Sequence, residues 1–215
     1  MADKSRTGRA VSSSAEGSND DEADGRVARR ERNSDAVIDA IMVLIQSGET
    51  RPNMADVARL AGVSERSIFR HFETREALFG AVIDRQIEVV TGLLHEIPSS
   101  GPVSARIDAF VAERARLYEE ITPMRRATVH FVEVSDLVAN QMAEMRVWLR
   151  DELGQVFERE LAKRAPADRR DLVAAIDVAT SWEAWNLLRT VEGCSVARAR
   201  RVTSRVMTRL LSGGA

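Results

Sequence analysis

The residues best suited to chemistry lie between positions 53 and 75. Glu65, Arg66, Ser67 and Arg70 fall on the outward face of a short predicted helix. Side chains of these types form hydrogen bonds with base edges and phosphate oxygens when a helix enters the major groove of DNA. Their types and spacing therefore predict contacts to nucleic acid.

Two short helices are expected to hold these side chains in place. Asn53, with Asp56 three residues later, resembles the capping box that starts a helix, and Gly62 ends that helix. Ser64 can cap a second helix, which runs from Glu65 to His71. The outward polar face belongs to this second helix.

The spacing of three residues matches a helix-turn-helix. Ala58 is small where the two helices cross, Gly62 takes the turn, where positive φ is cheap only for glycine, and Ile68 packs back onto the first helix. An ordinary helical hairpin is the alternative, because such residues also occur at these offsets by chance.

The segment MADVARLAGVSERSIFRHFETREALFGAVI, which begins at Met54, resembles the DNA-binding region of the TetR family of transcriptional regulators. The resemblance covers about residues 30–90. It implies an all-α protein, with an N-terminal three-helix helix-turn-helix domain followed by a helical ligand-binding and dimerisation domain. The DNA-binding residues that it implies are Asn53, Ser64, Glu65, Arg66, Ser67, Phe69, Arg70, His71 and Arg75.

Three positions depart from the family pattern. Phe69 replaces the usual tyrosine, so a hydroxyl that normally reaches a phosphate is missing. Arg75 replaces lysine at the start of the next helix, where it can still contact phosphate. Arg66 stands where a small residue is common, which indicates a site-specific base contact. Glu65 either accepts a hydrogen bond from cytosine or stabilises the helix N-terminus, and the operator sequence is left open.

The formal net charge of −2, from 31 Lys and Arg against 33 Asp and Glu, hides a local excess of arginine. Residues 26–32 hold four arginines and one glutamate, just after an acidic run. Arg29, Arg30 and Arg32 precede the first apolar helical pattern, where an arm can touch the DNA backbone or the minor groove. A solvated charged leader is an equal alternative for each of them.

Composition divides the chain into three parts. We expect a disordered tail at residues 1–25, which are rich in Ser, Gly, Asp and Glu. The DNA-binding domain is expected at 26–92, and the effector-binding and dimerisation domain at 93–215. The break PSSGP at 98–102 precedes five expected amphipathic helices. These helices are expected at 103–121, 123–136, 137–164, 168–192 and 196–212.

The resemblance implies that the last two helices pair with their copies in a homodimer, and that the central helices enclose a small-molecule effector. Candidate dimer contacts are Leu172, Ile176, Ala179, Leu187, Val202, Val206 and Leu210. Candidate effector contacts are Phe110, His130, Phe131, Met145, Trp148, Trp182, Trp185 and Asn186. Packing within the core of one subunit is the alternative for each of these residues.

Several classes of protein are not expected. The apolar runs are far shorter than the roughly 18 residues of a membrane span, and no secretory signal is evident. Cys194 is the single cysteine, and a redox role for it is left open. His95 and His130 lack metal-ligand spacing. We expect a cytoplasmic protein that is not an enzyme and that has no cofactor or metal.

The expected function is a ligand-responsive, homodimeric transcriptional regulator, most simply a repressor, acting on a palindromic operator. Its partners would be double-stranded operator DNA, a second copy of the chain and an unidentified small-molecule effector. One alternative is a helical interaction protein whose DNA-binding head has decayed, with Phe69 as a sign of it. Another is a DNA-binding regulator with a closed, effector-free pocket.

Overall fold

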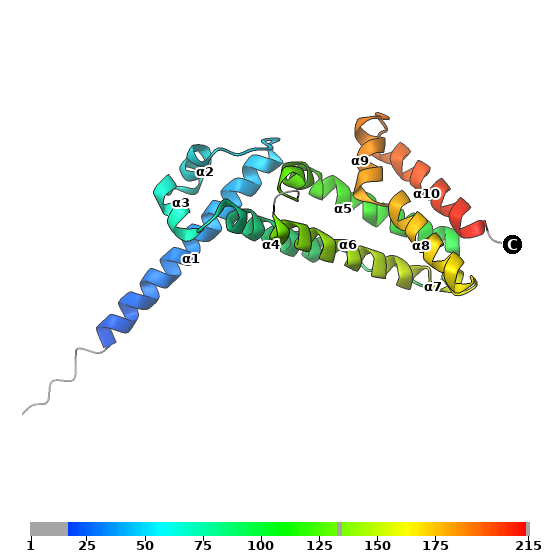
Figure 1. Ribbon diagram of the computed structural model, residues 1–215, viewed down its shortest axis with the longest axis horizontal. Helices are drawn as coiled ribbons and strands as arrows, with labels where there is room; N and C mark the ends of the chain where they lie inside the picture. The colour runs from blue at the N-terminus through cyan, green and yellow to red at the C-terminus, as the bar shows by residue number, and fades with distance from the viewer. Residues whose placement is uncertain (1–16, 133–134, 214–215) are drawn as a thin grey trace, which may run out of the picture.

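The computed structural model describes residues 17–132 and 135–213, which fold into helices joined by short connections (Figure 1). No strand occurs within these described ranges, and the predicted all-α class is confirmed. We call the first four helices the head: α1 (Gly17–Gln46), α2 (Met54–Ala61), α3 (Glu65–His71) and α4 (Arg75–Leu93). We call the rest the body: α5 (Val103–Val132), α6 (Asp136–Val156), α7 (Glu158–Leu161), α8 (Pro166–Ala179), α9 (Trp182–Thr190) and α10 (Val196–Ser212).

The predicted disordered tail is wrong for residues 17–25, which belong to α1; residues 1–16 lie outside the described part. The C-terminal half of α1 is anchored in the head core by Val37 and Ile41, both fully buried. Once a helix is nucleated, each further turn is cheap even without apolar side chains. The N-terminal half of α1 projects away from the other helices (Figure 1).

The sequence predicted that a helix would start at Pro123. Instead, α5 runs through Pro123 without ending. Proline removes one backbone N–H, but packing on its C-terminal side holds the helix together. Met124 and Ala127 are buried in the head core. The predicted boundary between 103–121 and 123–136 is therefore wrong.

Two other expected helices are each divided. The one at 137–164 breaks at Phe157, which is fully buried with its ring edge-on to Phe110, the centroids being 5.4 Å apart. The one at 168–192 breaks before Ser181, whose hydroxyl accepts a hydrogen bond from the backbone N–H of Ala184 and caps α9. The Tyr118 hydroxyl also donates to the Thr180 carbonyl at 2.7 Å. The helix expected at 196–212 is confirmed as α10.

Two helices, α4 and α5, contribute side chains to packing in both the head and the body. From α4, Leu78 and Val82 pack in the head core, whereas Val90 packs in a body cluster that includes Tyr118 and Trp185. From α5, Met124 and Ala127 reach into the head core. A change in how the body packs around α4 and α5 would therefore also change the packing of the head.

Arginines inside the body are paired. Arg106 is 2% exposed, and its guanidinium donates to the Glu160 carboxylate at 2.9 Å and to the Val156 carbonyl at 2.6 Å. The hydrogen bond from Arg106 lowers the pKa of Glu160 despite partial burial of that carboxyl. This pair ties α5 to α7.

Candidate nucleic-acid interface

The turn between α2 and α3 has the geometry predicted for a helix-turn-helix. The Asn53 side-chain oxygen accepts from the Asp56 backbone N–H at 2.8 Å, and the Ser64 hydroxyl accepts from that of Ser67 at 3.2 Å. Gly62 ends α2 with φ at 68°, in the left-handed region that glycine favours. The Val63 backbone N–H donates to the Ala58 carbonyl at 3.0 Å, which closes the turn.

The buried side of α3 fixes which of its residues face outward. Ile68 is fully buried in the head core with Val57 and Ala58 of α2 and Val37 of α1. An apolar anchor on one side of a seven-residue helix leaves its other sides in solvent. The predicted packing of Ile68 onto α2 agrees with this arrangement.

Glu65, Arg66, Phe69 and Arg70 of α3 are all exposed. None of the three charged side chains forms a hydrogen bond or ion pair within the described part of the chain. Phe69 is 51% exposed, a large apolar ring on the outward face. This surface therefore offers guanidinium groups that are free to bind phosphate or base edges.

Two predicted DNA-binding residues are occupied as helix caps. Asn53 caps α2, and its side-chain nitrogen also donates to the Asp56 carboxylate at 2.5 Å. The same carboxylate forms an ion pair with the Arg59 guanidinium at 3.0 Å. Hydrogen bonds from Arg59 and Asn53 lower the pKa of Asp56. Ser64 holds the first turn of α3. Both residues are positioning residues of the motif in this structure.

A cleft of about 560 Å³ separates α1 from α3. It brings the predicted arm and the predicted recognition helix to one site, although the arm residues lie within α1 and do not precede the first helix. Arg32 is exposed but does not line the cleft. The lining residues are Arg29, Arg30, Asn33, Gly62, Val63, Ser67, Arg70 and His71.

His71 lies in this cleft with both ring nitrogens buried and without a hydrogen-bond partner among the residues that the structure describes. Burial, together with the charges of Arg70 and Arg30, lowers its pKa. The imidazole is therefore neutral at neutral pH and can donate one hydrogen bond to a bound anion. Sequence reasoning missed Asn33, since nothing in its neighbourhood separates it from any other polar helical residue.

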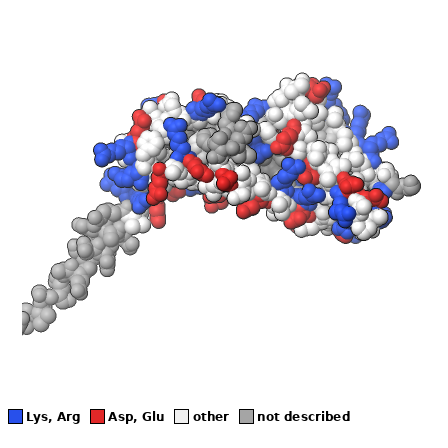
Figure 2. Space-filling model, viewed as in Figure 1, with Lys and Arg blue, Asp and Glu red and all other residues white. Residues whose placement is uncertain are grey.

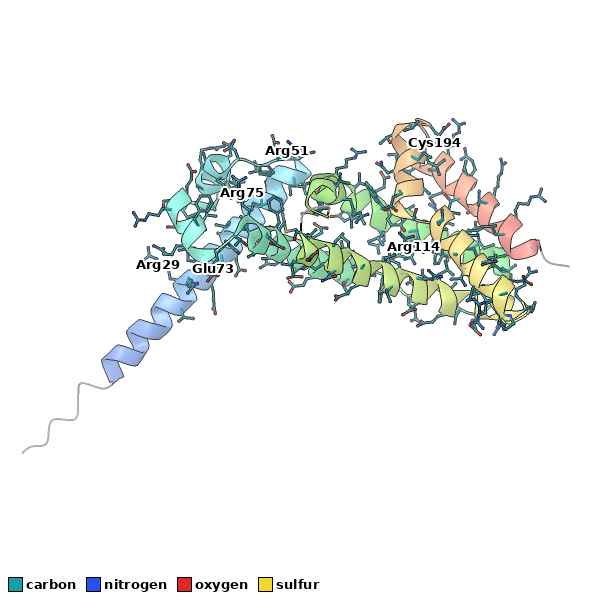
Figure 3. All side chains as sticks on the ribbon, viewed as in Figure 1. Arg29, Arg51, Glu73, Arg75, Arg114 and Cys194 are labelled. Atoms are coloured by element: carbon teal, nitrogen blue, oxygen red, sulfur yellow. The ribbon has the colours of Figure 1, made fainter. Side chains whose placement is uncertain are left out.

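The head also presents arginine beyond α3. Arg75 is exposed at the first turn of α4, whose N-cap Thr74 accepts from the Ala77 backbone N–H at 3.0 Å. Figure 3 shows Arg29, Arg51 and Arg75 on the head, and Figure 2 shows Lys and Arg side chains projecting at the end that holds α2 and α3. The N-terminal end of a helix beside an arginine favours an anion.

The body contains a cavity of about 480 Å³ between α4, α5, α6 and the start of α9, which we call the body cavity. Of the predicted effector contacts, Met145 and Trp182 line it. The described part of the structure says nothing of the side chains of His130 and Phe131.

Four other predicted effector contacts do not line the body cavity. Phe110 is fully buried in the core against Phe157, and Trp148 is 42% exposed. The indole N–H of Trp185 donates to Glu119 at 2.8 Å, and Asn186 accepts from Arg126 at 3.2 Å. Aromatic residue type alone did not distinguish core, surface and cavity.

The polar residues of the body cavity were missed. Gln86 and Arg114 line it, and both are at least 95% buried. The signal for Gln86 was its place in an apolar stripe, three residues after Ile83 and four before Val90, both of which also line the cavity. A polar residue inside such a stripe points into the protein.

The predicted dimer contacts divide by exposure. Leu187 and Val206 are exposed, and Ala179 and Val202 are half-buried. Leu172 and Leu210 pack against the body core of their own subunit. Ile176 is fully buried in that core and is not exposed at the surface of the subunit.

Other reactive groups are engaged elsewhere. Cys194 is buried, 3% exposed, near the turn before α10 (Figure 3), and His95 lies 3.4 Å from the Glu113 carboxylate. Within the described residues, no group of three or more His, Cys, Asp or Glu is placed to hold a metal ion. No helix in the part of the chain described here is long and apolar enough to cross a membrane.

The fold and the motif together define a class, that of all-α proteins with an N-terminal helix-turn-helix. A family profile described as bacterial regulatory proteins, tetR family, matches residues 38–82. Residues 38–82, which run from α1 into α4, are therefore similar to the tetR family of bacterial regulatory proteins.

Curated relatives match part of their length. An HTH-type transcriptional regulator of Staphylococcus aureus (strain MRSA252) is 24% identical over 110 residues, 49% of this chain and 56% of that protein. An uncharacterized HTH-type transcriptional regulator of Mycobacterium bovis is 37% identical over 79 residues, 34% of this chain and 40% of that protein. The chain thus spans about half the length of these relatives.

A solved structure matches over most of both chains. A transcriptional regulator from Rhodococcus sp. Rha1 superposes with a TM-score of 0.62 over 86% of this chain and 96% of that chain, at 17% identity. At this identity the likeness concerns the fold of both head and body.

Proposed function

We propose that this protein is a homodimeric, ligand-responsive transcriptional regulator that represses by binding a palindromic operator. The observation that carries the proposal is the outward face of α3, beside a cleft that Arg29 and Arg30 line. Arg66 and Arg70 on this face are exposed and have no partner among the described residues. Arginines left without partners in the free protein are ready to pair with phosphate and guanine. Its place of action is then the cytoplasm, where bacterial DNA lies.

A homodimer would present two copies of α3 to the two halves of the operator. Exposed apolar side chains support this: Val178 of α8 is 62% exposed, Leu187 of α9 53%, Val191 after α9 72% and Val206 of α10 40%. Such a concentration of exposed apolar residues on neighbouring helices is typical of a protein interface. In simple helix-turn-helix dimers the two recognition helices lie roughly 34–36 Å apart.

Contacts between α4 and α6 offer a route from the body cavity to the head. The Ser135 hydroxyl donates to the Glu76 carboxylate at 2.7 Å, and Gln141 donates to the Gly80 carbonyl at 3.2 Å. The same α4 lines the cavity through Ile83. A ligand that favours one arrangement of α4 against α6 would change the spacing of the two heads and so the affinity for DNA.

The proposal is tested with a labelled DNA fragment from the region before the protein's own coding sequence. Fluorescence anisotropy should show binding with two chains per site, and sedimentation velocity should show a dimer. Leu187→Glu with Val191→Glu should give a monomer with at least tenfold weaker DNA binding, because charges are buried at an apolar interface. Val147→Glu, a change at another exposed valine, is the control and should stay dimeric. A double variant that remains a dimer contradicts the proposed interface.

A further inference from the structure

Gln86 is a buried polar residue at the body cavity whose side-chain amide finds no partner within the described part of the structure. It is 5% exposed and lines the cavity, and neither its side-chain nitrogen nor its oxygen has a hydrogen-bond partner. A buried amide without partners costs on the order of a few kcal/mol, so such groups normally find one. A ligand group with a hydrogen-bond donor next to an acceptor would satisfy both the oxygen and the nitrogen of this amide.

Three hydroxyl groups at the cavity already have partners. The Tyr118 hydroxyl donates to the Thr180 carbonyl, and the Thr128 hydroxyl donates to the Arg125 carbonyl. The Ser181 hydroxyl donates to the Val178 carbonyl. These groups lie in the wall of the cavity without needing a ligand.

The arginines at the cavity are each paired with a carboxylate. Arg114 lies 2.7 Å from Glu152, and its guanidinium lies over the Phe110 ring, 4.5 Å from the ring centroid. Figure 3 shows Arg114 between α5 and α6. Arg125 lies 2.9 Å from Glu183 and stacks on Trp182 at 4.9 Å.

The third cavity arginine, Arg146, lies 3.3 Å from Asp177. With all three guanidinium groups compensated, a charged ligand would enter an apolar cavity without a free counter-charge. Burial of an unpaired charge there is strongly unfavourable.

We infer that the body cavity binds a neutral, mainly apolar molecule that carries one carboxamide-like group, with adjacent donor and acceptor, bound to the Gln86 side chain. The apolar part of the ligand would lie against Ile83, Leu117, Ile121, Met142, Met145 and Trp182. A volume of about 480 Å³ lies within the ordinary range for small-molecule sites. This inference rests on the proposed ligand response and names its chemistry.

The test uses four probes with one apolar body: 4-phenylbutyramide, 4-phenylbutyrate, 4-phenylbutylamine and the methyl ketone 5-phenylpentan-2-one. Isothermal titration calorimetry of the full-length protein at pH 7.5 should give the amide at least tenfold tighter binding than the anion and the cation. The ketone, which accepts but does not donate, should be intermediate. A tenfold difference corresponds to one or two net hydrogen bonds.

Gln86→Leu should remove the preference for the amide and raise the thermal midpoint of the ligand-free protein, because an unsatisfied amide leaves the interior. The midpoint separates loss of the ligand contact from a failure to fold. Gln155→Leu, at an exposed position of α6, is the matched control and should keep the preference. Tighter binding of the carboxylate or the amine, no binding by any probe, or a preference that survives in Gln86→Leu overturns the inference.

The same samples are titrated with the DNA fragment. Intact DNA binding together with no probe binding means that the cavity inference fails while the regulator proposal stands. Amide binding through Gln86 without any change in DNA affinity upholds the cavity chemistry and overturns the ligand response.

Discussion

Arginine has opposite roles in the head and in the body of this protein. In the head, Arg66 and Arg70 are exposed and unpaired within the described structure. In the body, Arg106 and Arg114 are at least 97% buried, and each is bonded to a carboxylate and a backbone carbonyl. The same side chain therefore serves as a binding group where it is free and as a structural tie where it is paired.

The consequence is a division of labour that can be measured. Removing a paired, buried arginine strands its carboxylate in the protein and should cost stability. Removing a free, exposed arginine should leave stability almost unchanged and cost affinity for a ligand. The comparison between head and body thus predicts which variants unfold and which only fail to bind.

The largest effect is expected for Arg106→Ala. Loss of this guanidinium leaves the Glu160 carboxylate, 15% exposed, without its partner, and should lower the free energy of unfolding by about 4 kcal/mol. Arg66→Ala, the control in the head, should change it by about 0.5 kcal/mol or less. Urea denaturation followed by circular dichroism measures both, and equal losses in the two variants would contradict the comparison.

The same pair predicts a dependence on pH. Because Arg106 holds the pKa of Glu160 below its usual value, the ionised pair stabilises the fold at neutral pH. That contribution is lost as the pH falls through the lowered pKa, so between about pH 5 and pH 3 the wild type should lose more stability than Glu160→Gln. Urea denaturation of the two proteins at several pH values in this window measures the difference. If their urea midpoints fall equally as the pH is lowered, the pair makes no such contribution.

A smaller loss is expected for Ile68→Ala, about 3 kcal/mol, because a fully buried side chain is truncated in the head core. The variant should also lose DNA binding, since α3 would no longer be held against α2. Leu60→Ala, at a 47% exposed position of α2, should cost about 0.5 kcal/mol or less. Thermal unfolding and anisotropy in parallel compare the two, and a stable Ile68→Ala variant would contradict the packing described here.

The smallest effect concerns the turn. Gly62→Ala places a Cβ on a residue with φ at 68° and should cost about 1 kcal/mol, although nothing lies within 4 Å of that Cβ. Gly154→Ala, within α6 and equally open, should instead stabilise by about 0.5 kcal/mol. Opposite signs in urea denaturation would confirm that the left-handed turn, and not crowding, requires glycine at residue 62.

The head was largely predictable because its determinants are local. Caps such as Asn53 and Ser64, the turn at Gly62 and the anchor at Ile68 act within a few residues of one another, so their spacing can be read directly. The cleft with α1 could not be foreseen, since it depends on how two helices cross.

The body was predictable in class but not in detail. Helix ends at Phe157 and Thr180 depend on contacts to Phe110 and Tyr118, which are distant in sequence. The continuation of α5 through Pro123 likewise depends on packing against the head. For the same reason, their aromatic type led to the prediction that Phe110 and Trp185 line a cavity, whereas in the structure both pack in the core.

The central claim is that the free arginines of α3 bind DNA, and the salt dependence of binding by Arg70→Ala tests it most directly. Wild-type affinity for the DNA fragment should fall linearly on a logarithmic salt scale, and Arg70→Ala should reduce the slope by about one. Arg159→Ala, an exposed arginine of α7 in the body, removes the same charge and should leave the slope unchanged. Binding that is absent, insensitive to salt, or equally affected by both substitutions would contradict the account.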